Sequence, residues 1–203
     1  MKTLLSTLFL LTSSIVCIAQ DDFYTEEFEL SFSTTMNGGE FVYNGKAHSF
    51  KIKVVSDSIR TTEHPNFITV GNRIVQSNAV PLPSSRLDLK KLTIEQQKEV
   101  LNGYVEYELD YFKNEIHLVC QNLQLEWVTV DARLWLIWSF DVPKQKATEG
   151  TSQPATSQIY ASTICFNQVL DLNIPVLKGD SKVKCKEHIH ELMNGLKLFD
   201  KKP

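Results

Sequence analysis

The sequence lacks the short motifs that commonly mark catalytic and phosphate-binding sites. It contains no G-x-S-x-G nucleophile elbow, no G-x-G-x-x-G dinucleotide-binding turn and no Walker A segment. Lysine and arginine form no basic block, and the formal net charge is −3, so the charge pattern that attracts nucleic acid or anionic lipid is missing. The most recognisable hydrolases, nucleotide-dependent enzymes and nucleic-acid-binding proteins are therefore disfavoured.

Long hydrophobic segments are confined to the start of the chain. Residues 1–19 contain a lysine, an apolar segment that begins at Leu4, and the small residue Ala19 before Gln20. This pattern predicts a secretory signal peptide that is removed, and hence an exported protein, periplasmic or extracellular. Its removal would take away Lys2 alone and change the formal charge from −3 to −4. No later apolar run approaches about 18 residues, so no membrane span is predicted.

Cys17 lies where a lipoprotein could carry an acylated cysteine. The residues before it, Ser14-Ile15-Val16, differ from a lipobox, which usually has leucine first and a small residue directly before the cysteine. We therefore expect cleavage after Ala19 or Gln20 and no anchoring at Cys17.

Cysteine is scarce in the rest of the chain. Cys120, Cys165 and Cys185 allow one disulfide and one leftover thiol, in three pairings. If the last four strands alternate in direction, the final helix begins at the end of the sheet that holds Cys120, while Cys165 lies at the other end. A strand of eight residues spans about 26 Å, which is beyond disulfide reach. Cys120 and Cys185 are therefore the predicted disulfide pair, and a buried free thiol at Cys185 is the alternative.

The densest group of reactive side chains is VKCKEHIHELM, residues 183–193. At about 100° per residue on a helix, Cys185 lies at the centre of an apolar stripe, His188 flanks it and His190 points the opposite way. Cys185 and His188 would supply two ligands, whereas tetrahedral zinc takes three or four from protein. A core-facing thiol is also poorly placed as a nucleophile. We predict no metal site, no cofactor and no catalytic residue.

Alternation of apolar and polar residues predicts an antiparallel sheet. The first strand is expected within Glu26–Thr35, and the chain continues as a meander. Surface loops are expected at residues 56–66, 77–91 and 144–157. Turns between strands are predicted at Asn37-Gly38-Gly39, Asn44-Gly45, Gly71-Asn72, Asp131-Ala132 and Phe166-Asn167-Gln168.

Two helices are predicted to cover this sheet. Thr93 and Gln96 form a capping box at the start of a long amphipathic helix, 94–113, and a terminal helix is expected at 182–199. The strand Arg133–Asp141 is apolar on both faces, which is typical of a strand covered on both sides. The pattern therefore predicts a sheet with a layer on each face.

Three tyrosines, Tyr104, Tyr107 and Tyr111, accompany the apolar stripe of helix 94–113. Such a series can form an aromatic platform for a ligand, but aromatic residues at helical spacing beside a core stripe more commonly pack. We therefore expect these rings to contribute to packing.

The order of elements resembles a known fold. HSFKIKVVSDSI is similar to the opening strand and turn of the Mog1/PsbP-like family, and IYASTICFNQVLDLNIPVL with CKEHIHELMNGLKLF resembles its closing hairpin and terminal helix. The chain departs from the family at Val55-Ser56 and Ile59, where members often have proline and tryptophan. The resemblance implies an antiparallel sheet between helices. It implies no activity, because members mainly serve as binding or assembly factors, and no functional residue is carried over.

These observations predict one exported α+β domain, residues 20–203. We expect an antiparallel sheet of about six or seven strands, covered by helices as an α/β/α sandwich. The expected function is that of a non-catalytic exported protein that binds a protein partner or a small ligand.

Two other function classes stay open. An enzyme with an unrecognised cleft would need His64, His117 or His188 to meet a carboxylate, and an inhibitor or immunity-type protein would use its surface loops against a target enzyme. A deep pocket with convergent polar groups would favour the enzyme, and a shallow apolar patch would favour the binding protein.

Overall fold

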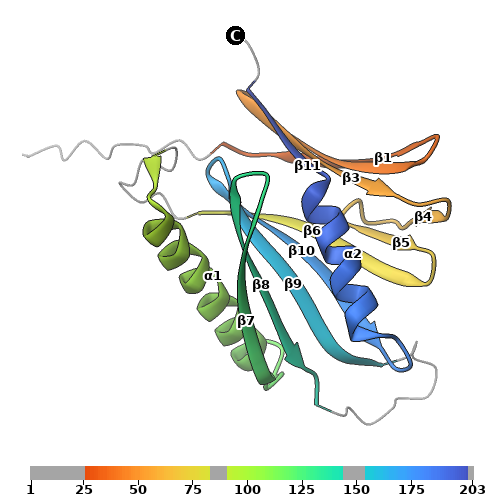
Figure 1. The fold of residues 1–203 in the computed structure, drawn as a ribbon, viewed down its shortest axis with the longest axis vertical. Helices are drawn as coiled ribbons and strands as arrows, with labels where there is room; N and C mark the ends of the chain where they lie inside the picture. Colours follow the sequence, from red (N-terminus) through yellow and green to blue (C-terminus); the bar gives the residue numbers. More distant parts are fainter. Residues whose placement is uncertain (1–25, 83–90, 144–153, 201–203) are drawn as a thin grey trace, which may run out of the picture.

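The computed structural model describes residues 26–82, 91–143 and 154–200. The predicted signal peptide, residues 1–19 with Cys17, lies outside the described residues. Within them the chain forms two antiparallel sheets and two helices, α1 (Ile94–Asn114) and α2 (Lys182–Asn194) (Figure 1).

The larger sheet has seven strands in the order β4-β5-β6-β10-β9-β8-β7. Its strands are β4 (Ile59–Thr61), β5 (Phe67–Val70), β6 (Arg73–Pro81), β7 (Gln121–Val130), β8 (Arg133–Asp141), β9 (Ala155–Cys165) and β10 (Gln168–Leu177). The smaller sheet has the order β1-β2-β3-β11. Its strands are β1 (Glu29–Thr35), β2 (Gly38–Asn44), β3 (His48–Val55) and β11 (Leu196–Asp200).

Two hydrophobic clusters lie on opposite faces of the seven-stranded sheet. Alternate residues of β8 divide between them: Trp135 and Ile137 join the cluster with α2 and the smaller sheet, whereas Leu136, Trp138 and Phe140 join the cluster with α1. Figure 1 shows α1 and α2 on the two sides of this sheet. The predicted α+β class, with helices on both faces of an antiparallel sheet, is confirmed. The first three strands and β11 form a separate sheet, which the sequence did not distinguish.

Local signals placed most of the turns and α1 correctly. The Thr93 hydroxyl accepts from the Gln96 N–H, and the Gln96 side chain accepts from the Thr93 N–H, which confirms the capping box. Asp131 and Ala132 both have positive φ, 48° and 60°, as a two-residue turn between twisted antiparallel strands requires. Phe166 also has positive φ, 55°, in the β9–β10 turn.

The terminal helix is shorter than the predicted 182–199. α2 ends at Asn194, Gly195 caps it, and Leu196–Asp200 pair with β3 as β11. The Lys53 N–H donates to the Gly195 carbonyl at 3.0 Å, and a Cβ on Gly195 would clash with the Lys53 carbonyl oxygen. This close approach between distant segments ends the helix, and nothing in the local pattern reveals it.

The predicted loops also contain strand residues. In the 77–91 segment β6 continues to Pro81, and in the 144–157 segment β9 begins at Ala155, because both strands pair with β10. The 56–66 segment contains the short edge strand β4. Residues 83–90 and 144–153 lie outside the described residues.

Candidate functional site

The predicted disulfide partners lie on different faces of the seven-stranded sheet. Cys120 packs with the α1 cluster, whereas Cys185 is fully buried in the α2 cluster. Cys120, Cys165 and Cys185 are all free thiols in this structure. The helix does begin near the expected end of the sheet, since Lys182 Nζ lies 3.8 Å from Asp141 Oδ1. The structure does not support the Cys120–Cys185 disulfide, since the two thiols lie on opposite faces of the sheet. A helical wheel shows which side of α2 is apolar, but it does not show which face of the sheet α2 covers.

The segment VKCKEHIHELM has the orientation predicted from the helical wheel. Cys185 and His188 are buried, and His190 is only half-buried. Burial lowers the pKa of His188 and raises the pKa of the Cys185 thiol. Within the described ranges, no three His, Cys, Asp or Glu side chains are grouped to hold a metal ion. Neither described helix is long and apolar enough to cross a membrane.

The three histidines named for an enzyme do not converge. His64 is exposed in the loop before β5, with its ring 6.4 Å from that of Phe67. His117 is exposed after α1, with φ 58°. His188 is buried between α2 and the sheets. None of the three lines the main cleft of the described structure.

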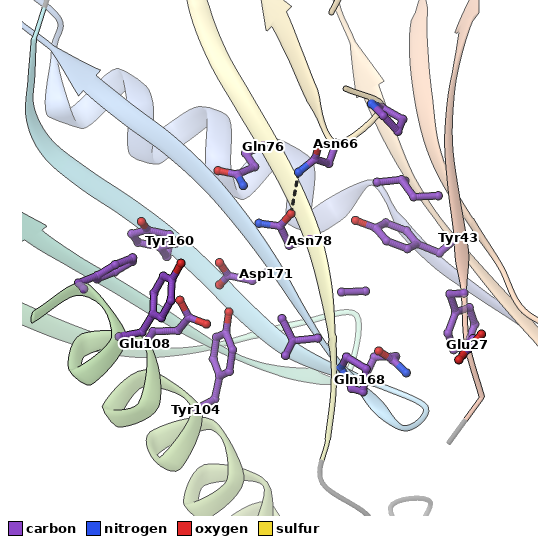
Figure 2. A pocket seen from close by; sticks show the side chains of 18 residues that line it. Glu27, Tyr43, Asn66, Gln76, Asn78, Tyr104, Glu108, Tyr160, Gln168 and Asp171 are labelled. Atoms are coloured by element: carbon purple, nitrogen blue, oxygen red, sulfur yellow. Dashed lines mark hydrogen bonds between the residues drawn. The ribbon is translucent and has the colours of Figure 1, made fainter. Parts of the chain in front are cut away.

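That cleft has a volume of about 760 Å³ and lies between α1, β6 and the β1–β2 hairpin (Figure 2). Two features of the fold create it. β5 pairs with β6 at Arg73–Gln76, and no described strand pairs with the remainder of β6 on that side. α1 makes its main contacts with β8 and β9, so the helix lies toward that side of the cleft.

Asp171 forms the base of the cleft on the α1 side. It lies mid-way along β10, is 3% exposed, and accepts a hydrogen bond from Ser162 Oγ at 2.5 Å. Ser162 Oγ in turn accepts from Trp138 Nε1 at 2.9 Å. Burial raises the pKa of Asp171 well above its ordinary value, and Glu108 adds to this rise. Hydrogen bonds with Ser162 and Trp138 act in the opposite direction.

The facing wall comes from α1 and β9. Tyr104 and Glu108 are four residues apart and therefore share one helical face, where both line the cleft. Burial raises the pKa of Glu108 and of Tyr104 and Tyr160. The Tyr160 ring stacks on Trp138, with ring centroids 4.0 Å apart. Figure 2 shows Tyr104, Glu108, Tyr160 and Asp171 around one space.

Amide side chains and a further tyrosine line the part of the cleft beside β6. Asn66 Nδ2 donates to Asn78 Oδ1 at 3.0 Å, and Gln76 lies on the same strand as Asn78. On the hairpin side, Tyr43 forms a 2.8 Å hydrogen bond with Ser77. The cleft thus combines carboxyl, amide and aromatic groups.

Sequence reasoning missed this site. Asp171 is the one charged residue in QVLDLNIPVL, a strand otherwise suited to burial, and this was a usable signal. Tyr104 is buried, as the packing interpretation predicted, but it also lines the cleft. Tyr111 lines the cleft as well while 45% exposed, and Tyr107 is 63% exposed. For these two rings the packing prediction was wrong.

Comparison with known proteins shows likeness of fold only. No family model matches the chain, and no relative is found among curated proteins. The solution structure of cyanobacterial PsbP (CyanoP) from Synechocystis sp. PCC 6803 is similar with a TM-score of 0.41 and 9% identity, over 84% of this chain and 92% of that one. The Saccharomyces cerevisiae Ran-binding protein Mog1p has a TM-score of 0.35 and 10% identity, over 84% and 96%. The chain has a weak fold-level resemblance to Mog1/PsbP-like proteins.

Proposed function

We propose that this protein binds a small organic molecule in the cleft and does not catalyse a reaction on it. The observation that carries the proposal is Asp171, a carboxyl buried at the base of an open cleft. Burying a carboxyl without a cationic partner costs stability. Residues that oppose stability in this way are typical of functional sites.

The size and chemistry of the cleft suit a small ligand. Its volume of about 760 Å³ lies within the usual range for small-molecule sites. Three carboxyl residues, Glu27, Glu108 and Asp171, are among the described lining residues, and none of those residues is lysine, arginine or histidine. The electrostatic field of these groups disfavours anionic ligands.

Binding without catalysis is favoured by the positions of the histidines. His64, His117 and His188 lie outside the cleft, so none can exchange a proton with Asp171 or Glu108 there. The convergent polar groups nevertheless favour a second candidate function, which is acid–base catalysis. Asp171 and Glu108 both have raised pKa values, as general acids commonly do.

Ligand-observed NMR with a mixture of small polar metabolites tests the proposal on the chain 20–203. Gln76→Trp should fill the cleft, because Gln76 lines it. Ile74→Trp is the matched control, since Ile74 lies two residues earlier on β6, is exposed, and is absent from the described lining. We expect the same compounds to bind the wild type and Ile74→Trp, and binding to be lost in Gln76→Trp.

The result identifies the function class. Compounds recovered unchanged after prolonged incubation support a binding protein, and conversion of a bound compound supports the enzyme. If no compound binds, or if both tryptophan variants bind equally well, the cleft is not the site.

We also infer that the protein is exported, on the basis of residues 1–19. When the full chain is expressed in a Gram-negative host, N-terminal sequencing of the periplasmic fraction should give Gln20 or Asp21 as the first residue. A product that retains residues 1–19 in the cytoplasm would contradict export.

A further inference from the structure

We propose that the ligand of the cleft carries an ammonium or guanidinium group, which binds between Asp171, Glu108 and the rings of Tyr104 and Tyr160. This inference rests on the proposed binding function and specifies the chemical class of the ligand.

The fold directs these four side chains to one place. On β10 the alternation of the strand turns Leu170 toward the α2 cluster and Val169 toward the α1 cluster, so Asp171 faces α1. Tyr160 pairs with Asn173, two residues along from Asp171, and projects from the same face. Figure 2 shows Tyr104 and Glu108 approaching this position from α1.

The charge in this part of the cleft is unbalanced. Asp171 is 3% exposed, and the groups that stabilise its ionised form are the neutral donors Ser162 and Trp138. Glu108 adds a second carboxyl that opposes ionisation of Asp171. Because no basic side chain occurs among the described lining residues, a cationic ligand would supply the missing positive charge.

The aromatic rings favour the same ligand class. Tyrosine faces attract ammonium and guanidinium groups through the ring quadrupole, and this attraction is stronger where water is excluded. Tyr104 is 9% exposed and Tyr160 is half-buried, so both rings offer a partly dehydrated surface beside the carboxyls. A cation favours the ionised form of both carboxyls and can form charge-assisted hydrogen bonds with them. A neutral ligand brings no such charge, and an anion would be repelled by an ionised carboxyl.

Tyramine and tyrosol form a matched pair of probes for this inference. They share a phenol and a two-carbon chain, but tyramine ends in an amine, which is protonated at about pH 7.5, and tyrosol ends in a hydroxyl. We expect the wild-type chain 20–203 to bind tyramine at least about tenfold more tightly than tyrosol in NMR titrations. The Trp138 indole N–H signal should shift with tyramine, because this group is linked through Ser162 to Asp171.

Two variants test which carboxyls hold the amine. Asp171→Asn and Glu108→Gln should each weaken tyramine binding by about tenfold and change tyrosol binding by less than about twofold. Glu106→Gln is the control, because Glu106 is exposed on the same helix and absent from the described lining. It should bind both probes as the wild type does. Glu108 lies on the surface of α1 and is half-buried, so its variant keeps the test valid if Asp171→Asn does not fold.

The outcomes separate this inference from the proposed function. Equal binding of tyramine and tyrosol, or equal loss of both in the variants, would overturn the amine preference. If other compounds still bind in the Gln76-dependent site, the binding function stands. If nothing binds in that site, both proposals fail.

Discussion

At the scale of single residues, Asp171 should lower the stability of the protein. Its folded-state pKa is raised above the ordinary value of 3.8. Well below pH 3.8 the carboxyl is neutral in both the folded and the unfolded chain, so it does not lower the free energy of unfolding. As the pH rises through the interval between 3.8 and the raised value, ionisation favours the unfolded chain.

Asp171→Asn should therefore raise the free energy of unfolding at pH 7, because asparagine carries no charge that folding must bury. The gain should vanish near pH 3. Urea denaturation at both pH values measures it, and Asp110→Asn, at an exposed position on α1, is the control. A variant less stable than the wild type at pH 7 would contradict the assignment. Together with the loss of amine binding, a gain in stability would identify Asp171 as a residue kept for function.

The cysteines provide a second prediction at this scale. Cys165 and Cys185 are fully buried, and burial raises the pKa of Cys165 to about 12. Cys120 is half-buried. Iodoacetamide should alkylate Cys120 at least about tenfold faster than the other two in the native chain 20–203, because alkylation requires an accessible thiolate.

In urea without reductant, all three thiols should react. Mass spectrometry of tryptic peptides measures the alkylation rate of each cysteine in the native chain and in urea. Recovery of a Cys120–Cys185 peptide from material purified from the periplasm would restore the sequence-based disulfide and overturn the packing of α2 seen here.

At the scale of elements, the junction of α2 and β11 depends on a glycine. A Cβ at Gly195 would clash with the Lys53 carbonyl oxygen, so Gly195→Ala must displace β11 from β3. We expect a loss of about 1–3 kcal/mol in the free energy of unfolding. Gly103→Ala is a control of opposite sign, because Gly103 lies within α1 with nothing within 4 Å of a Cβ. Gly103→Ala should raise the free energy of unfolding by about 0.5–1 kcal/mol. Similar effects of both substitutions in urea denaturation would contradict the close approach.

The same junction shows which elements a sequence can reveal. α1 and the Asp131-Ala132 turn were predictable because their signals lie within a few residues of the structure they specify. β11 was not predictable from local signals, because Leu196 pairs with Ile52, and these two residues are far apart in the sequence. The cleft was missed for the same reason: Asp171 and Asn78 become neighbours only through the β6–β10 register.

At the scale of the whole molecule, Glu26 links the two sheets. Its side chain accepts hydrogen bonds from the Ala47 N–H at 2.5 Å and the His48 N–H at 3.1 Å, and contacts His48 Nδ1 at 2.5 Å. Its carbonyl accepts from Gln168 Nε2, on β10 of the larger sheet, at 2.9 Å. The His48 ring also stacks on Phe166, with centroids 4.2 Å apart. This group of contacts fixes the smaller sheet beside the β9–β10 turn.

The pH dependence of Glu26 should be opposite to that of Asp171. Burial tends to raise the pKa of Glu26, but its hydrogen bonds with His48 and Ala47 outweigh burial and lower the pKa below 4.5. The stabilisation is therefore complete above pH 4.5 and is lost as the pH falls through the lowered value.

Glu26→Gln should reduce the free energy of unfolding at pH 7 by about 1–3 kcal/mol, and by less at pH 3. Glu29→Gln, at an exposed position on β1, should have little effect in the same urea titrations. If Glu26→Gln costs the same at both pH values, the carboxylate charge does not stabilise its contacts with Ala47 and His48, and those contacts contribute packing alone.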